Sequence, residues 1–160
     1  MPVSVSETGG KLRGRWLRES VLAGEEALMK QEVEAAFAEM LDISTDIDKA
    51  VLFSPTEVLA SNMPEGARAA AVAQAGELTQ LGQARAAEMG SQPFTQLVVE
   101  TPAGYVFFAR ETLTDGMAML ATGKKGSRVG LVLYDLRTCM RDAREAVTAK
   151  AADVESTGEA

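Results

Sequence analysis

The chain has 160 residues, with 16 Lys and Arg against 23 Asp and Glu, so its net charge at neutral pH is −7. This length favours one domain with extended ends, and the acidic balance argues against nucleic-acid binding. Histidine is absent and Cys139 is the only cysteine, which removes Ser-His-Asp and Cys-His catalytic arrangements and any internal disulfide. No apolar run reaches the roughly 20 residues that span a bilayer, and the N-terminus lacks the apolar core of a secretory signal, so we expect a cytoplasmic protein.

Residues 1–27 are predicted to form a basic N-terminal extension. Residues 1–10 show no hydrophobic periodicity, which is typical of a disordered leader. The following stretch, KLRGRWLRES, places four basic side chains around Trp16. Its apolar face is short, which favours a solvated helix end or a partner contact over contact with a membrane. Helix-favouring residues continue to Leu41, with Gly24 as a candidate break between two helices.

Residues 28–147 are predicted to form the folded domain, which begins with a helix and a β-hairpin. Apolar residues recur at helical spacing along one face of the helix, at Met29, Val33, Ala36, Phe37 and Met40. Two β-prone runs, 49–53 and 57–61, then flank a Ser-Pro-Thr turn whose proline suits the second turn position.

The rest of the domain is predicted to consist of a helix, three strands and a final helix. A helix is expected over 65–89, then two strands around a turn at 101–104 and a third strand within 115–122. The last helix is expected to start near Ser127 as its N-cap and to bury one face, formed by Val129, Val132, Leu133, Leu136, Met140 and Ala143. Residues 148–160 are small and acidic and are predicted to be a flexible tail. The element order, helix-strand-strand-helix-strand-strand-strand-helix, predicts an α+β fold with a five-stranded, mostly antiparallel sheet layered with helices.

The stretch MAMLATGKKGSRVG, residues 117–130, is similar in composition to a nucleotide-binding phosphate loop. That motif needs a glycine where Ala118 stands and a Ser or Thr where Lys125 stands, so the pattern fails twice. A helix N-terminus beside two lysines can still attract an anion. We favour a simple strand-to-helix turn from Gly123 to Gly126, with no cofactor.

The acidic segment after the first helix does not match a metal site. Asp46, Asp48 and Glu57 fall at positions 1, 3 and 12 of a calcium loop, but Val51 replaces the required glycine. We therefore expect no metal and interpret Asp42, Asp46 and Asp48 as loop and capping residues. Cys139 lies near the apolar stripe of the last helix and is expected to be a small packing residue.

The middle helix has an unusual second face. Its core side is predicted to carry Ala71, Ala75, Leu78, Gly82 and Met89, with Leu81 at the edge. The opposite side, here called the small-residue face, consists of Ala69, Ala73, Gly76, Gln80, Ala84 and Ala87. A solvent-facing surface usually carries charged residues, whereas small side chains let another helix approach closely. The face therefore favours a partner surface, the alternative being that alanine simply favours helix.

These segments resemble the roadblock/dynein-light-chain family, in particular bacterial members that act with a Ras-like motility GTPase. The resemblance covers about residues 30–147 and depends on AVLFSPTEVLAS, the Ala-rich middle helix, TQLVVETPAGYVFFARETLTDGMAMLAT and GLVLYDLR. It implies a homodimer in which the middle helices pack antiparallel and the strands after them form one continuous sheet. Leu97 and Val99, on the first of those strands, would join the small-residue face in the dimer interface.

The resemblance also implies that the protein has no catalytic residues of its own. Its expected partner is a small Ras-like GTPase bound over the middle helices, and the best-understood bacterial members stimulate GTP hydrolysis by reshaping the active site of the GTPase. The side chains expected to contact the GTPase are Arg68, Gln83, Arg85 and Glu88.

The predicted function is therefore a dimeric, non-enzymatic regulator or scaffold of a small Ras-like GTPase. A small-ligand sensory domain with a five-stranded sheet is the alternative, but the sequence offers few convergent polar groups for a ligand pocket. An enzyme ranks third because histidine and recognisable catalytic motifs are absent.

Overall fold

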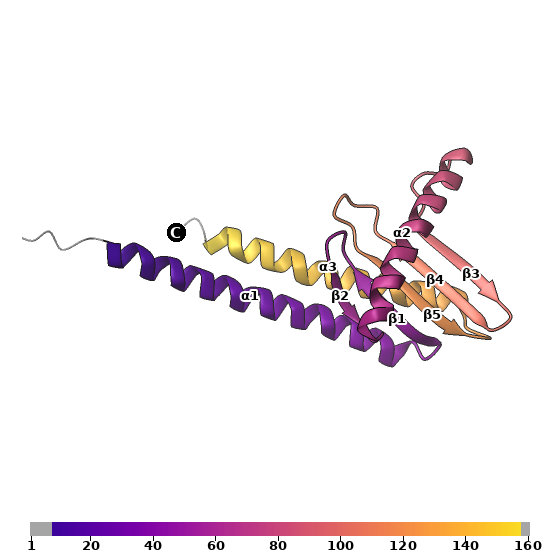
Figure 1. The fold of residues 1–160 in the computed structure, drawn as a ribbon, viewed down its shortest axis with the longest axis horizontal. Helices are drawn as coiled ribbons and strands as arrows, with labels where there is room; N and C mark the ends of the chain where they lie inside the picture. The colour runs from indigo at the N-terminus through magenta and orange to yellow at the C-terminus, as the bar shows by residue number, and fades with distance from the viewer. Residues whose placement is uncertain (1–7, 158–160) are drawn as a thin grey trace, which may run out of the picture.

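The computed structural model describes residues 8–157 and has the predicted α+β fold in the predicted element order (Figure 1). The elements are α1 (Thr8–Ile43), β1 (Ile47–Phe53), β2 (Val58–Ser61), α2 (Glu65–Glu88), β3 (Gln96–Thr101), β4 (Gly104–Arg110), β5 (Ala118–Lys124) and α3 (Val129–Thr157).

The five strands form one sheet in the order β2-β1-β5-β4-β3, and every neighbouring pair is antiparallel. The two predicted hairpins and the β3-β4-β5 meander are confirmed. Sequence reasoning did not reveal the pairing of β1 with β5, in which Leu52 lies opposite Met119. This pairing joins the two hairpins into a single sheet, with β2 and β3 at its edges.

Helices cover both faces of the sheet, α1 and α3 on one side and α2 on the other (Figure 1). Successive strand residues point to opposite faces. On β4, Phe107 and Ala109 therefore belong to the core beneath α1 and α3, whereas Phe108 belongs to the core beneath α2. The burial of both faces explains why the central strands are apolar at consecutive positions rather than at alternate ones.

The larger core lies between the sheet and the α1–α3 pair. Helix α1 contributes Val33, Phe37 and Met40, as the helical spacing predicts. The predicted apolar face of α3 is also confirmed, with Val129 half-buried and the other members buried: Val132, Leu133, Leu136, Met140 and Ala143. Cys139 is buried among them, which agrees with a packing role.

Both long helices extend further than the sequence suggests. Helix α1 passes through Gly24 without a break, because a single exposed glycine costs a helix only about 1 kcal/mol. Residues 8–10 of the expected leader lie in α1, and residues 148–157 of the expected tail lie in α3. The remaining residues of those two predictions, 1–7 and 158–160, lie outside the described residues. Between residues 8 and 157, no helix is both long enough and apolar enough to cross a membrane.

Candidate functional site

Helix α2 packs on the sheet through small residues. Its buried positions are Ala71, Ala75, Gly82 and Ala86, and Leu78 is half-buried. The predicted core side is therefore correct except for Met89, which lies just past the helix end and is 77% exposed. Ala86 was missed, although it follows Gly82 by four residues and helical spacing therefore places it on the same face.

Gly82 allows α2 to lie directly on an aromatic ring. A Cβ atom at this position would come within 2.6 Å of the Phe94 ring. Phe94 in turn stacks on Phe108, with 6.1 Å between ring centroids, and the Arg110 guanidinium lies over the Phe94 ring, 5.0 Å from its centroid. The C-terminal half of α2 is thus held over the residues that lead into β3.

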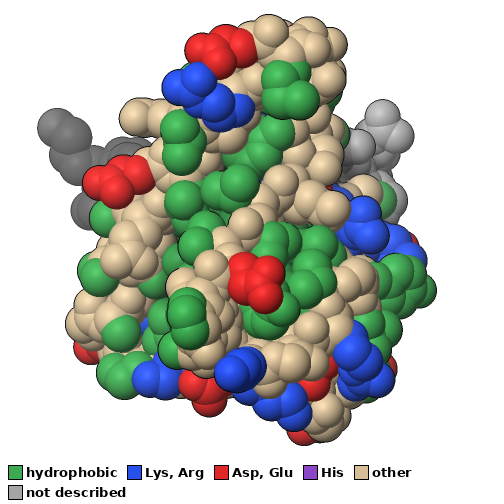
Figure 2. Space-filling model, turned by 90° about the vertical axis from the view of Figure 1, so that its right-hand side faces the viewer, with side chains coloured by type: hydrophobic (Ala, Val, Ile, Leu, Met, Phe, Trp, Pro, Cys, Tyr) green, Lys and Arg blue, Asp and Glu red, His purple; other side chains and the backbone are tan. Residues whose placement is uncertain are grey.

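The small-residue face of α2 is exposed along its whole length. All six members are exposed, and no atom lies within 4 Å of a Cβ built on Gly76. Figure 2, which views the molecule from the right-hand side of Figure 1, shows hydrophobic side chains gathered over the middle of this side, with most charged side chains toward its margins. A single chain therefore leaves an uncharged helix surface open to solvent.

Leu97 and Val99 lie on the same side of the sheet as α2. Both are on β3, the edge strand that pairs with β4 alone among the described strands. Leu97 packs against the α2-side core, and Val99, two residues further along, shares its face and is 40% exposed. The structure thus brings the predicted interface residues to one side of the molecule, next to a strand edge with free hydrogen-bonding groups.

The four residues expected to contact a GTPase do not form one cluster within a chain. Gln83, Arg85 and Glu88 are exposed near the C-terminal end of α2, where Arg85 and Glu88 form an ion pair of 2.6 Å. Arg68 lies about 25 Å away along the helix, given a rise of about 1.5 Å per residue. It is half-buried, not freely exposed as expected, because its Nε donates a 2.8 Å hydrogen bond to the carbonyl of Met63.

The glycine-lysine turn carries an internal anion. The Asp46 carboxylate lies at the N-terminus of α3, where its Oδ2 accepts hydrogen bonds from the backbone N–H of Arg128 at 3.0 Å and from its Nε at 3.2 Å. Lys124 Nζ lies 3.4 Å from Oδ1. The backbone hydrogen bond from Arg128, together with the side chains of Arg128 and Lys124, lowers the pKa of Asp46 against an opposing effect of burial. The position where a phosphate would bind is therefore already filled.

This geometry corrects the predicted helix cap. The Ser127 hydroxyl donates to the carbonyl of Lys124 at 2.5 Å, so it closes the turn and leaves the capping of α3 to Asp46. Gly126, with φ of 85°, supplies the left-handed residue that the turn needs. The interpretation of Asp46 as a capping residue agrees with this contact, although Arg128, whose backbone N–H it accepts, lies 82 residues away.

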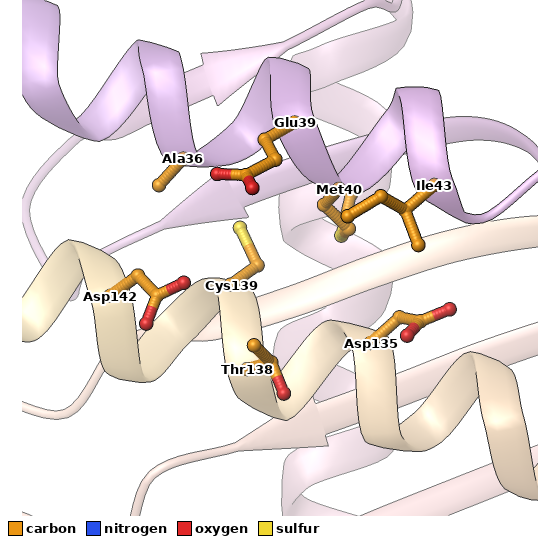
Figure 3. A pocket seen from close by; sticks show the side chains of 8 residues that line it. All are labelled: Ala36, Glu39, Met40, Ile43, Asp135, Thr138, Cys139 and Asp142. Atoms are coloured by element: carbon orange, nitrogen blue, oxygen red, sulfur yellow. The ribbon is translucent and has the colours of Figure 1, made fainter.

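A small cavity of about 60 Å³ lies between α1 and α3 (Figure 3). It contains the Cys139 thiol, which points toward α1, and carboxylates from both helices, contributed by Glu39, Asp135 and Asp142. Burial, and to a lesser extent the charge of Asp142, raises the pKa of Cys139 to about 12, so the thiol stays protonated and is not a nucleophile at neutral pH. Within residues 8–157, no three His, Cys, Asp or Glu side chains are arranged to hold a metal ion.

Comparison with solved structures identifies the fold. A Roadblock/LC7 domain from Streptomyces avermitilis matches 72% of this chain and 97% of its own, with a TM-score of 0.63 and 15% identity. The gliding protein MglB from Thermus thermophilus matches 74% and 90%, with a TM-score of 0.61 and 15% identity. Myxococcus xanthus MglB matches 76% and 91%, with a TM-score of 0.60 and 11% identity. No family model and no curated protein matches the sequence. The chain has the fold of the Roadblock/LC7 domains.

Proposed function

We propose that this protein is a dimeric, non-enzymatic regulator or scaffold of a small Ras-like GTPase and that it acts in the cytoplasm. The small-residue face of α2 is the observation that carries this proposal, because it is exposed, uncharged and continuous. The fold supports it, since the similar solved structures include Roadblock/LC7 domains and the gliding protein MglB. The sequence resembles bacterial roadblock members that act with such a GTPase.

In the proposed dimer, two α2 helices pack antiparallel through the small-residue face. The edge strands β3 meet alongside and carry Leu97 and Val99 into the contact. A twofold arrangement places every interface residue in the contact twice, so a modest surface on one chain becomes a substantial interface. Residues 28–147 form the dimerising domain in this proposal, and 1–27 and 148–160 are a basic extension and an acidic tail.

The GTPase would bind over the ends of the paired helices. Gln83, Arg85 and Glu88 are exposed there in each chain. An antiparallel pair sets the N-terminal end of one α2, which carries Arg68, beside the C-terminal end of the other. Arg68 lies about 25 Å from Arg85 of its own chain, but in the proposed dimer it lies beside Arg85 of the partner subunit. Arg68 remains the weakest candidate of the four because its guanidinium already bonds to Met63.

A regulator of this kind needs no chemistry of its own. The Cys139 thiol is protonated, and the anion position at α3 is occupied by Asp46. The nucleotide and the catalytic groups would then belong to the GTPase, whose hydrolysis the bound regulator would accelerate. To affect the nucleotide cycle, the regulator must bind the two nucleotide states with different affinity. The switch segments, which order around the γ-phosphate, provide that difference.

The test is a pull-down with a small Ras-like GTPase encoded beside the gene, loaded with GDP or with a non-hydrolysable GTP analogue. We expect greater recovery of the GTP form and a faster single-turnover hydrolysis rate in the presence of the regulator. Replacing both Arg85 and Glu88 by Ala should reduce recovery, whereas Arg15→Ala, at an exposed arginine on α1, should not. Equal recovery of both forms would reduce the role to a passive scaffold, and recovery of neither would reject this GTPase as the partner.

A further inference from the structure

A cavity of about 380 Å³ opens beside the small-residue face of α2. The middle of α2 forms one wall through Gly76, Thr79 and Gln80. The β1–β2 turn and the loop between β4 and β5 form the others. This volume falls in the range of about 300–1,000 Å³ that is typical of ligand pockets, and the cavity is continuous with the proposed partner surface.

The walls of this cavity are largely apolar. Phe53, Phe108, Met117 and Ala118 line it from the sheet, and Leu113 lines it from the loop. Leu113 is 57% exposed, although it is a large aliphatic side chain. An apolar side chain of a partner that enters the cavity would bury both its apolar wall and Leu113. Burial of this apolar surface favours binding.

One cation that lines this cavity, Arg110, has no ion-pair partner among the described residues. Arg110 is half-buried at the end of β4, on the same face of the strand as Phe108, and lines the cavity. Its guanidinium lies over the Phe94 ring, and its Nη1 is buried with no hydrogen-bond partner. Among residues 8–157, no carboxylate forms an ion pair with it.

The neighbouring carboxylate is engaged elsewhere. Glu111 directly follows Arg110 and also lines the cavity, but it pairs with Arg144 on α3, through contacts of 3.1 and 3.2 Å, and accepts the backbone N–H of Met117 at 3.1 Å. Arg144 also donates to the carbonyl of Asp115, at 3.0 Å. These bonds hold the loop in place and keep Glu111 from neutralising Arg110. Unpaired buried donors are rare in folded proteins, and a carboxylate is the strongest acceptor for a guanidinium.

We propose that this cavity is an anchor site for a protein partner that presents an apolar side chain next to a carboxylate. The apolar group fills the space between Phe53, Phe108 and Leu113, and the carboxylate pairs with Arg110. The unpaired charge of Arg110 and the exposed apolar side chain of Leu113 support this occupant. The inference rests on the proposed function and deepens it, because it adds to the GTPase contacts at the helix ends a second contact beside the middle of α2, where a carboxylate next to an apolar side chain is recognised.

The direct test uses the full chain, labelled with nitrogen-15, titrated with two capped dipeptides, Phe-Asp and Phe-Asn. These probes have nearly the same shape and differ in one charge. We expect Phe-Asp to bind about tenfold more tightly, as a hydrogen bond to a charged group implies. The amide signals that shift should be those of the cavity, including Thr79, Gly116 and Ala118. Equal affinity for the two probes, or shifts confined to other residues, would overturn the proposal.

Variants separate the charge from the apolar wall. Arg110→Gln should abolish the preference for Phe-Asp, and Leu113→Ser should weaken both probes by a similar factor. Arg15→Gln makes the same chemical change on an exposed part of α1 and should leave both affinities unchanged. If Arg110→Gln perturbs the fold, Arg110→Lys retains the charge and should retain the preference. If folded Arg110→Lys and the control Arg15→Gln both lose the preference for Phe-Asp over Phe-Asn, the loss is not specific to Arg110 and its proposed role is rejected.

Two further experiments show whether the ligand is a protein or a small molecule, and separate this proposal from the GTPase proposal. Tighter binding of 3-phenylpropionate than of Phe-Asp would indicate a small-molecule site and overturn the assignment to a protein partner. Arg110→Gln should reduce recovery of the GTPase in the pull-down at least several-fold. If the wild type recovers no GTPase, the proposed function fails for that partner, and the dipeptide titration still decides whether the anchor site exists.

Discussion

Helices α2 and α3 cover opposite faces of the same sheet with very different side chains. Helix α3 buries large residues such as Leu133, Leu136 and Met140, whereas α2 buries only alanines and Gly82. Burial of a large aliphatic side chain contributes about 1.5–3 kcal/mol, several times more than burial of an alanine. The α3 side can therefore stabilise the fold within one chain. The α2 side contributes less to that stability. Its outer face lacks the charged residues of a solvated helix, so it is suited to contact with a second protein.

The largest effect on stability is expected from Leu136→Ala in α3. The Leu136 side chain is fully buried, so its truncation should lower the free energy of unfolding by about 2–5 kcal/mol. Urea denaturation followed by circular dichroism measures the change. Leu131→Ala is the matched control on the same helix, because Leu131 is exposed and its truncation should cost well under half as much. Similar losses in the two variants would contradict the assignment of α3 to the main core.

A smaller loss is expected from Gly82→Ala in α2. The new methyl group would meet the Phe94 ring, and such overpacking costs about 1–3 kcal/mol. The control is Gly130→Ala in α3, where no atom lies within 4 Å of the added Cβ. There the substitution should be neutral or stabilising by up to about 1 kcal/mol. Opposite signs for the two glycines in thermal or urea denaturation would confirm that α2 approaches the sheet through Gly82; equal signs would exclude it.

A pH-dependent effect is expected at the N-terminus of α3. The pKa of Asp46 is lower in the folded chain than its ordinary value, so the carboxylate stabilises the fold above that ordinary value, about pH 4, and the stabilisation is lost as the pH falls through the lowered pKa. Asp46→Asn keeps an acceptor for Arg128 but cannot titrate. The wild type should therefore lose more stability than Asp46→Asn when urea midpoints are compared at about pH 6 and about pH 3. An equal loss in both proteins would show that Asp46 does not contribute to the acid sensitivity.

The smallest effect on the fold of each chain is expected from Gly76→Arg. Its side chain would enter open solvent in a single chain, whereas in the proposed dimer it would enter the helix contact twice, at about 1–3 kcal/mol per site. Light scattering should show a dimeric wild type at tens of micromolar and a variant shifted toward monomer, with an unchanged circular dichroism spectrum. Gln74→Arg lies on α2 outside the small-residue face and should remain dimeric. A monomeric wild type would remove the dimer proposal.

Local patterns in the sequence were sufficient to locate most of the fold. The helical spacing of Val33, Phe37 and Met40 and the turn at 54–56 depend on neighbours a few residues apart, and the structure has them as predicted. The ends of the long helices were harder to place. Gly24 resembles a helix break in isolation, but α1 continues through it. The inward-facing alanine of α2, Ala86, was also missed, although its spacing of four residues from Gly82 places it on the core face.

The sequence by itself determined the order of the elements, the apolar faces of α1 and α3, the uncharged face of α2 and the absence of histidine chemistry. These properties follow from residue type and from spacing within single elements. Only the tertiary structure decided which groups satisfy one another across the chain. It sets Asp46 at the start of α3, directs Glu111 to Arg144 and leaves Arg110, beside an apolar cavity, without an ion pair among the described residues. Such pairings depend on strand register and helix placement, which bring together charges that are distant in the sequence.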